Sequence, residues 1–367
     1  MNILIVKLSA IGDVIHTLPA LAALRRCYPD ADITWVVEEA AADLLTGHPD
    51  LDRVLVSRRK AWMRDIRRGR VAAPLREMRA FFRELRSRSY DLVIDFHGLF
   101  KSAVIVLLSG GKRKLGYNSM QEGSRLFYNE KIPEAMETHA VDRYLDFIRY
   151  LAGNGVEPSR LTTSPEFTIA GGEEGLWHRI ALRDEPPEGI ESVESRGDGA
   201  ESGGGRKPER RFVAVSPVAF WETKLWEDDK FAELGDRIHR ELGIAVILTG
   251  GEAGPLEKIR ARMKTAAVNL GGQTTLRELA SLYRDASLVI TTDSGPMHLA
   301  AAVGTPVVAL FGPTDPARTG PCGPGHRIIR RGISCSPCFR KQCEAPRCMT
   351  EITVEDVFAA VKDMLGK

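Results

Sequence analysis

The sequence carries almost no net charge, because 51 lysine and arginine residues are balanced by 49 aspartate and glutamate residues. An overall basic balance therefore does not support a nucleic-acid partner, and no RNA-binding signature supports one either. Long hydrophobic runs are also missing, since no apolar segment reaches the roughly 18 to 20 residues that a membrane-spanning helix needs. The N-terminal sequence lacks the charged region and cleavage site of a secretory signal, so we expect a cytosolic protein.

Length and apolar content favour two domains. The 367 residues are 43% apolar, which is enough for a large core. Short apolar strands alternate with helical segments, and this alternation predicts parallel sheets with right-handed crossovers. We expect an α/β protein with two Rossmann-like domains whose sheets face each other across a cleft. The predicted strands are Ile3 to Val6, Ile33 to Val37, Asp91 to Asp95, Phe212 to Ser216, Ala245 to Leu248, Ser287 to Thr291 and Val307 to Leu310.

A polar segment marks the expected domain boundary. Between residues 184 and 211 apolar residues nearly vanish, and Gly, Ser, Pro, Glu and Arg dominate. Such a composition cannot build a core, so we expect a flexible insertion. The predicted organisation is a domain at 1–175, a linker at 176–211, a domain at 212–350 and an amphipathic helix within 351–367.

The segment from Leu288 to Gly312 reads as strand, tight turn, helix and strand, with its polar residues gathered in the turn. Asp293, Ser294 and Gly295 follow the strand directly. A helix that starts there directs backbone N–H groups toward a ligand and favours anions, so phosphate or pyrophosphate is the expected ligand, with His298 as a further donor. The alternative is that Asp293 or Ser294 merely caps the helix.

Polar residues also follow three other predicted strands, at the edge where open parallel sheets bind ligands. Asp13 lies at a helix start, as a general base or a plain N-cap. Lys224 lies in a loop between two tryptophans, as a phosphate contact or a solvated lysine. Glu252 follows two glycines and accepts ribose hydroxyls or is simply an exposed acid, because no GxGxxG motif accompanies it.

Residues 58–70 form the densest charged run, with seven cations in thirteen residues and Asp65 as the only acid. Trp62 and Met63 lie between the cations. This pattern suits a phosphorylated or carboxylated substrate at an anionic membrane surface, although most such runs are only solvated faces. Nucleic acid is a weaker alternative.

Four of the six cysteines cluster within fourteen residues of a loop. This pattern suggests a structural metal site, with zinc as the default and iron as an option, against free or redox-paired thiols. The candidate ligands are Cys335, Cys338, Cys343 and Cys348.

Taken together, these segments resemble the heptosyltransferases of bacterial lipopolysaccharide core synthesis, an inverting glycosyltransferase family of GT-B architecture. The resemblance covers almost the whole chain apart from the insertion. Its most specific pieces are KLSAIGDVIHTLPAL at the start, WVVEE at 35–39, RRKAW at 58–62, DFHGLFKSA at 95–103, KLW at 224–226 and TDSGPMHLAAAVGTPVVALFGPTDP at 292–316. WVVEE, the basic run and GLFKSA look most like heptosyltransferase I, the branch that adds the first heptose to Kdo-lipid A.

The resemblance implies roles for individual residues. Asp13 matches the catalytic base. Donor-binding positions match Lys224, Glu252, Asp293, Ser294, Gly295 and His298, and the expected acceptor-binding residues are Arg58, Arg59, Lys60, Arg64 and Lys101. The cysteine cluster occurs in only some family members, which argues against a catalytic role.

The implied activity is transfer of L-glycero-D-manno-heptose from ADP-heptose to Kdo of the lipopolysaccharide inner core. No cofactor is expected to be required for catalysis, and the protein is expected at the inner face of the inner membrane as a cytoplasmic, peripheral enzyme. The alternatives are transfer to a later core heptose or to protein, a nucleotide-sugar epimerase of the same architecture, or a metal-dependent binding or regulatory protein that works through the cysteines.

Overall fold

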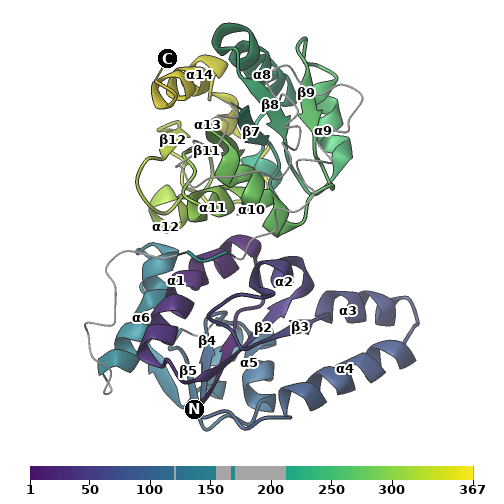
Figure 1. Ribbon diagram of the computed structural model, residues 1–367, viewed down its shortest axis with the longest axis vertical. Helices are drawn as coiled ribbons and strands as arrows, with labels where there is room; N and C mark the ends of the chain where they lie inside the picture. Colours follow the sequence, from purple (N-terminus) through teal and green to yellow (C-terminus); the bar gives the residue numbers. More distant parts are fainter. Residues whose placement is uncertain (120, 154–166, 170–211, 367) are drawn as a thin grey trace, which may run out of the picture. The chain divides into compact units, whose positions relative to one another are not determined.

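The computed structural model describes residues 1–119, 121–153, 167–169 and 212–366, and it divides into two compact units (Figure 1). The first unit includes Met1–Ala170, and the second includes Gly171–Pro316 and Gly320–Lys367. The flexible insertion predicted at 184–211, together with the boundary predicted at residue 175, lies outside the described residues.

The first unit is built around a six-stranded sheet in which every neighbouring pair of strands is parallel. Its strands are β1 (Asn2–Val6), β2 (Asp32–Glu38), β3 (Arg53–Ser57), β4 (Leu92–Asp95), β5 (Arg113–Tyr117) and β6 (Glu130–Ile132). Its helices are α1 (Ile11–Cys27), α2 (Glu39–Leu45), α3 (Arg59–Arg67), α4 (Ala72–Leu85), α5 (Phe100–Leu108) and α6 (Ala140–Gly153), with a 3₁₀ segment η1 (Gln121–Phe127).

The second unit repeats this plan with another six-stranded parallel sheet. Its strands are β7 (Phe212–Ser216), β8 (Ala245–Leu248), β9 (Ala267–Asn269), β10 (Leu288–Thr292), β11 (Val307–Phe311) and β12 (Arg327–Arg330). The helices along this part of the chain are η3 (Glu222–Lys224, 3₁₀), α8 (Asp228–Leu242), α9 (Ala253–Arg260), α10 (Leu276–Asp285), α11 (Gly295–Ala302), α12 (Pro316–Thr319), α13 (Arg347–Thr350) and α14 (Val354–Met364).

The two sheets share one strand order. The first runs β3-β2-β1-β4-β5-β6, and the second runs β9-β8-β7-β10-β11-β12 when read in the same sense. Successive strands are therefore added first on one side of β1 and then, from β4 onward, on its other side, and the same switch in strand order lies between β7 and β10 in the second sheet. Open α/β sheets bind ligands beyond the carboxyl ends of the two strands at such a switch point. The prediction of two Rossmann-like parallel sheets is confirmed.

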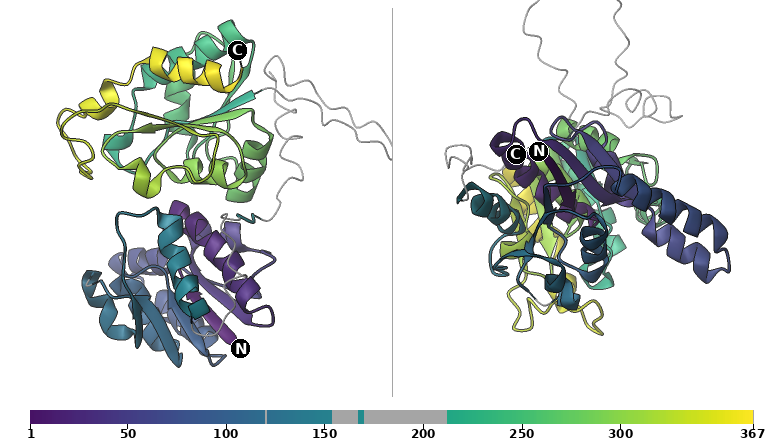
Figure 2. Two further views of the ribbon diagram at one scale, coloured as in Figure 1. Left: turned by 90° about the vertical axis from the view of Figure 1, so that its left-hand side faces the viewer. Right: turned by 90° about the horizontal axis from the view of Figure 1, so that it is seen from below.

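The basic run that the sequence left unassigned forms a helix. Residues Arg59–Arg67 make up α3, which packs against α4, and Figure 2 shows the two helices side by side, projecting from the rest of their unit. Both helices are amphipathic, with Trp62 of α3 and Phe81 of α4 buried in contact at a ring-centroid distance of 5.8 Å. Among the described residues, no helix is both long and apolar enough to cross a membrane.

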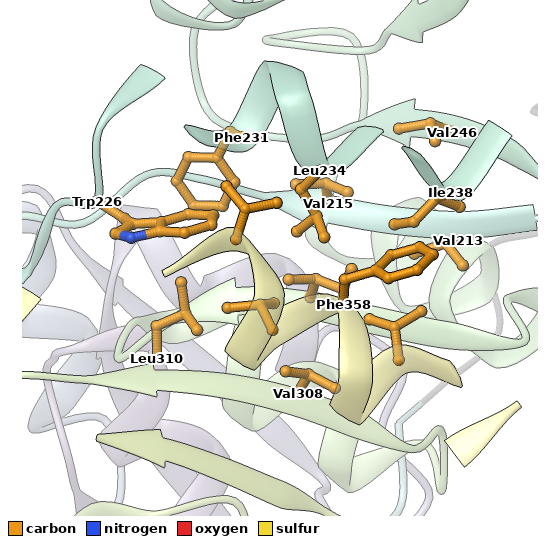
Figure 3. Packing of buried hydrophobic residues seen from close by; sticks show 14 of the residues in the cluster. Val213, Val215, Trp226, Phe231, Leu234, Ile238, Val246, Val308, Leu310 and Phe358 are labelled. Carbon is orange, nitrogen blue, oxygen red and sulfur yellow. The ribbon is translucent and has the colours of Figure 1, made fainter. Parts of the chain in front are cut away.

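The C-terminal helix belongs to the core of the second unit. Phe358 of α14 is buried among side chains from β7, α8 and β11 (Figure 3). Trp226 lies in the same cluster, and its indole Nε1 donates to the Ile352 carbonyl at 2.9 Å. The amphipathic pattern predicted for this helix is therefore confirmed, and packing assigns its apolar face to the second unit.

Candidate active site

Asp13 lies beyond the carboxyl end of β1, in the first turn of α1. The N-cap of α1 is Ala10, and Asp13 is the third residue of the helix, where its side chain accepts from the N-cap backbone as in a capping box. Asp13 therefore caps the helix from inside its first turn rather than as the N-cap, and its role as a base stays a prediction. Its Oδ2 accepts a hydrogen bond from the Ala10 backbone N–H at 3.1 Å, and its Oδ1 accepts one from the Tyr144 hydroxyl at 3.2 Å. Asp13 is half-buried. A half-buried carboxylate held through both oxygens is placed to accept a proton from a bound hydroxyl.

Lys7 and Tyr144 lie close to Asp13 and are both buried. The Lys7 Nζ donates to the Tyr144 hydroxyl at 2.6 Å and to the Phe96 carbonyl at 3.1 Å. Burial lowers the pKa of Lys7, and the charges of Asp13 and Asp95 act in the opposite direction. The end of β1 is thus joined to α1, to α6 and to the residue that follows β4.

Asp95 ends β4 on the other side of the switch point and is fully buried. It accepts hydrogen bonds from the Tyr128 hydroxyl at 2.7 Å and from the backbone N–H of His97 at 2.9 Å. Burial raises the pKa of Asp95 in spite of these bonds. The pKa of the neighbouring His97 is lowered to about 3, chiefly by burial and then by the charges of Lys7 and Lys101, so its imidazole is neutral at pH 7.

Three of the five predicted acceptor-binding cations converge on a buried acid that the sequence did not single out. Glu38, at the end of β2, is only 3% exposed at its side chain. Its carboxylate lies 2.9 Å from Lys60 Nζ, 3.3 Å from Arg59 and 3.7 Å from Lys101 Nζ. Burial acts to raise the pKa of Glu38, but Lys60, Lys101 and Arg59 together hold it below its ordinary value.

The remaining cations of the run have a different environment. Arg58 pairs with Glu39 at 2.8 Å and with Glu77 at 2.9 Å, although Asp65 is the only acid within the run itself. Arg64 is exposed, and it lines a cavity of about 440 Å³ together with Arg59, Lys60, Met63, Arg67 and Arg68. Folding therefore splits the run into cations matched by acids and cations that face solvent.

In the second unit, Lys224 and Asp293 meet across the switch point. Lys224 lies in η3 after β7, and its Nζ is 2.6 Å from Asp293 Oδ2, which also accepts from the Thr314 hydroxyl at 2.6 Å. The Lys224 ammonium also lies 4.5 Å from the centroid of the Trp221 ring. Asp293 is buried, at 4% exposure, and Lys224 is partly exposed. An ammonium has three donors, so Lys224 can bind a phosphate oxygen while it remains paired.

Helix α11 begins immediately after Asp293. Ser294 is its N-cap, but the Ser294 hydroxyl donates to the Thr292 carbonyl at 3.3 Å rather than capping the helix. The capping alternative thus holds for the position of Ser294 but not for its side chain, and Asp293 pairs with Lys224 and Thr314 instead. The donor-binding roles of both residues stay predictions. Gly295 is partly exposed in the first turn, and His298 is buried one turn further on. The start of this helix combines positive dipole charge with a nearby ammonium, which is a suitable arrangement for a diphosphate.

Glu252 lies after β8 as the N-cap of α9 and is exposed. Its position at the carboxyl edge of the sheet agrees with the predicted place. No described contact joins it to Lys224 or Asp293, so its role as a donor contact stays a prediction.

The four clustered cysteines do not form a metal site in the described part of the chain, where no three His, Cys, Asp or Glu side chains are placed to hold an ion. Cys348 is buried, whereas Cys335 and Cys343 are exposed. Burial raises the pKa of Cys348, and the other three thiols raise it further, so the cluster is close in space. Cys338 is partly exposed, so the four thiols differ in burial, and metal binding by this cluster stays a prediction.

Sequence reasoning missed Glu38, Tyr144 and Thr314. Glu38 ends β2 inside the quoted WVVEE segment, and this position was the available signal. Tyr144 is distant in sequence from Asp13, and no local pattern distinguishes it from a packing residue. Thr314 lies inside the quoted segment 292–316, and that motif was the available signal for it.

Two parallel sheets of one strand order, each with charged side chains at its switch point, define a doubly wound α/β protein, a class that binds ligands beyond the carboxyl ends of its strands. Residues 78–349 match the sequence profile of glycosyltransferase family 9 (heptosyltransferase), and the chain belongs to this family.

Curated relatives extend this match over nearly the whole chain. A lipopolysaccharide heptosyltransferase 1 from Pseudomonas aeruginosa is 30% identical over 391 aligned residues, covering 100% of this chain and 98% of that protein. The protein of the same name from Escherichia coli K12 is 30% identical over 337 residues, covering 90% of this chain and 93% of its own.

Solved structures agree on the GT-B fold. The E. coli heptosyltransferase WaaC with ADP matches with a TM-score of 0.72 at 25% identity, over 99% of this chain and 100% of that chain. A glycosyltransferase family 9 protein from Veillonella parvula matches with a TM-score of 0.78 at 23% identity, over 99% and 97% of the two chains, which shows the fold alone.

Proposed function

We propose that this enzyme transfers L-glycero-D-manno-heptose from ADP-heptose to Kdo of the lipopolysaccharide inner core, on Kdo-lipid A, with inversion at the anomeric carbon. The family match and the names of the full-length relatives support heptose transfer in lipopolysaccharide core synthesis. The single observation that carries the chemistry is the Asp13 carboxylate, half-buried and oriented through both oxygens beyond β1.

The proposed reaction is a single displacement. Asp13 accepts the proton of a Kdo hydroxyl, and the oxygen of that hydroxyl attacks the anomeric carbon of the heptose. The bond between this carbon and the ADP oxygen breaks as the new glycosidic bond forms, and ADP leaves with the bonding electrons. One displacement at carbon gives inversion.

The second unit is proposed to bind the donor. Lys224, anchored on Asp293, and the start of α11 after Ser294 face the charge that builds on the departing diphosphate. Positive groups that are already fixed in place stabilise the developing charge of a transition state without having to reorganise. Such electrostatic stabilisation is usually the largest contribution to catalysis. The solved WaaC complex with ADP supports a nucleotide site in this fold.

The acceptor is proposed to bind at the first unit, near the basic helix α3. The cavity lined by Arg59, Lys60, Arg64 and their neighbours offers several donors to a carboxylate or phosphate. Exposed cations beside the exposed Met63 and Leu75 also suit an anionic lipid surface, so we place the enzyme in the cytoplasm at the inner face of the inner membrane.

The test is to incubate the purified full chain with ADP-heptose and either Kdo-lipid A, an already heptosylated core or no acceptor, while measuring ADP release and the fate of the donor. Release with Kdo-lipid A alone is expected. Release of ADP with the heptosylated core would show that the acceptor is a later heptose of the core. Conversion of the donor without acceptor, with no ADP released, would indicate an epimerase.

The base is tested by Asp13→Ala, which should lower kcat by about 10²-fold to 10⁴-fold while the dissociation constant of ADP stays unchanged. Near-normal turnover in this variant would refute the assignment of Asp13.

A further inference from the structure

We infer that Tyr144 is a positioning residue for the transfer reaction, because its hydroxyl, itself held by Lys7, fixes the orientation of the Asp13 carboxylate. This inference rests on the proposed function of Asp13 as the base. It assigns a role to two buried polar side chains that the mechanism above does not use.

The three side chains form one short chain of hydrogen bonds within the first unit. The Tyr144 hydroxyl lies 2.6 Å from Lys7 Nζ and 3.2 Å from Asp13 Oδ1. Lys7 comes from the end of β1, Asp13 from α1 and Tyr144 from α6, and the two helices pack against each other. Lys7 and Tyr144 are each only 4% exposed.

Packing fixes the tyrosine ring. The ring of Tyr144 meets Phe96 edge to face at a centroid distance of 5.8 Å, and the Lys7 ammonium lies 4.4 Å from its centroid. Lys7 is held a second time by the carbonyl of Phe96 at 3.1 Å. The hydroxyl therefore has little freedom to turn away from Asp13.

The direction of each hydrogen bond follows from the chemistry of the donors. The Lys7 Nζ donates to the Tyr144 hydroxyl, so the tyrosine oxygen accepts in this contact. The single hydroxyl hydrogen of Tyr144 is then directed to Asp13 Oδ1. Lys7 thus determines that Tyr144 is the donor to Asp13, and it also holds the tyrosine hydroxyl in place.

Tyr144 does not act as the base itself. Burial and the nearby charge of Asp13 raise the pKa of Tyr144 well above its ordinary value, so the hydroxyl stays protonated near neutral pH. It remains a donor throughout. Each carboxylate oxygen has two lone-pair sites, so the bonds from Tyr144 and Ala10 fix the plane of the Asp13 carboxylate without preventing a substrate hydroxyl from bonding to it.

Other ionisable groups of the first unit act electrostatically on the three hydrogen-bonded side chains. The groups coupled to Asp13, Lys7 or Tyr144 are Asp95, His97, Tyr117, Glu134 and Arg143. Near neutral pH His97 and Tyr117 stay uncharged, because burial lowers the pKa of the first and raises the pKa of the second.

The test compares Tyr144→Phe with a matched control, Tyr117→Phe. Tyr117 is equally buried, and its hydroxyl donates to the Arg143 carbonyl of α6 at 3.2 Å, so its variant also loses one buried hydroxyl. We expect Tyr144→Phe to lower kcat for heptose transfer about 10-fold or more, with KM for ADP-heptose within twofold of the original. The acid limb of the kcat profile should move to higher pH, because the ionised carboxylate loses a donor that stabilises it. Tyr117→Phe should leave kcat and the acid limb in place.

A second variant, Lys7→Met, removes the group that orients the hydroxyl and should produce the same kinetic pattern if it folds, as circular dichroism would show. An unchanged kcat and an unmoved acid limb in Tyr144→Phe would overturn the inference. The proposed function would then still stand if Asp13→Ala is inactive, whereas an active Asp13→Ala would refute the base itself.

Discussion

Lys224 and Asp293 form an ion pair with 2.6 Å between Nζ and Oδ2, and this contact joins the loop after β7 to the loop after β10. The first unit has a lysine at the corresponding place, since Lys7 after β1 reaches the carbonyl of Phe96 after β4. In both units a lysine therefore closes the switch point, but only in the second is its partner an acid and its ammonium partly exposed. This difference suits the second unit for an anionic ligand.

We expect Lys224→Ala to reduce kcat/KM for ADP-heptose about 100-fold, because the departing diphosphate loses its fixed positive charge. Asp293→Asn keeps the shape but weakens the anchor of Lys224, and a loss of about 10-fold is expected. Steady-state kinetics and ADP titration calorimetry measure both effects. Lys258→Ala, at an exposed position on α9, is the matched control and should change neither value. Equal ADP affinity in Lys224→Ala and the control would exclude Lys224 from the donor site.

The pH dependence of stability should report on Glu38. Its pKa lies below the ordinary value of 4.5, so ionised Glu38 contributes stability above that pH, and the contribution is lost as pH falls through the lower folded-state pKa. Glu38→Gln should therefore lower the free energy of unfolding by about 1 kcal/mol at pH 7 and by progressively less below pH 4.5.

Urea unfolding at several pH values tests the expectation for Glu38. Glu233→Gln on α8 is the control, because this glutamate is exposed and its loss should change the unfolding free energy by less than about 0.5 kcal/mol. If Glu38→Gln lowered the free energy of unfolding by the same amount from pH 7 to below pH 4, the three cations would not be what stabilises the ionised carboxylate.

Phe358 anchors α14 in the core of the second unit, so Phe358→Ala should lower the free energy of unfolding by about 3 to 5 kcal/mol. Phe358→Leu keeps most of the volume and should cost clearly less. Urea unfolding followed by tryptophan fluorescence is suitable, because Trp226 lies in the same cluster. If both variants lost the same free energy of unfolding, the volume of the Phe358 side chain would not explain its contribution to stability.

Thiol labelling should separate the clustered cysteines. Cys335 and Cys343 are exposed and should react quickly with iodoacetamide, whereas Cys348 is buried with a raised pKa and should react only in urea. Mass spectrometry of the labelled peptides identifies the sites. Protection of both Cys335 and Cys343 in the native protein, reversed by a chelator, would show that the thiols do hold a metal.

Alternation of short apolar strands with helices was enough to predict the parallel sheets, and the strand from Phe212 to Ser216 was located to the residue. The basic helix α3 and the strands β3, β5, β6, β9 and β12 were not predicted. Arg59–Arg67 is dominated by cations, and β5 begins with Arg113 and Lys114, so neither has the apolar pattern that marks a buried element. Their positions depend on tertiary packing.

By itself, the sequence determined the class of fold, the turns after the strands and the family, because these depend on local patterns of apolar residues, glycines and short motifs. Only the tertiary structure decided which charges meet. Glu38 reaches Lys60 and Lys101, Tyr144 reaches Asp13, and Lys224 reaches Asp293 because parallel strands bring distant loops to one edge of a sheet. The same packing buries Cys348 and leaves Cys335 and Cys343 exposed, which a count of cysteine spacings cannot reveal.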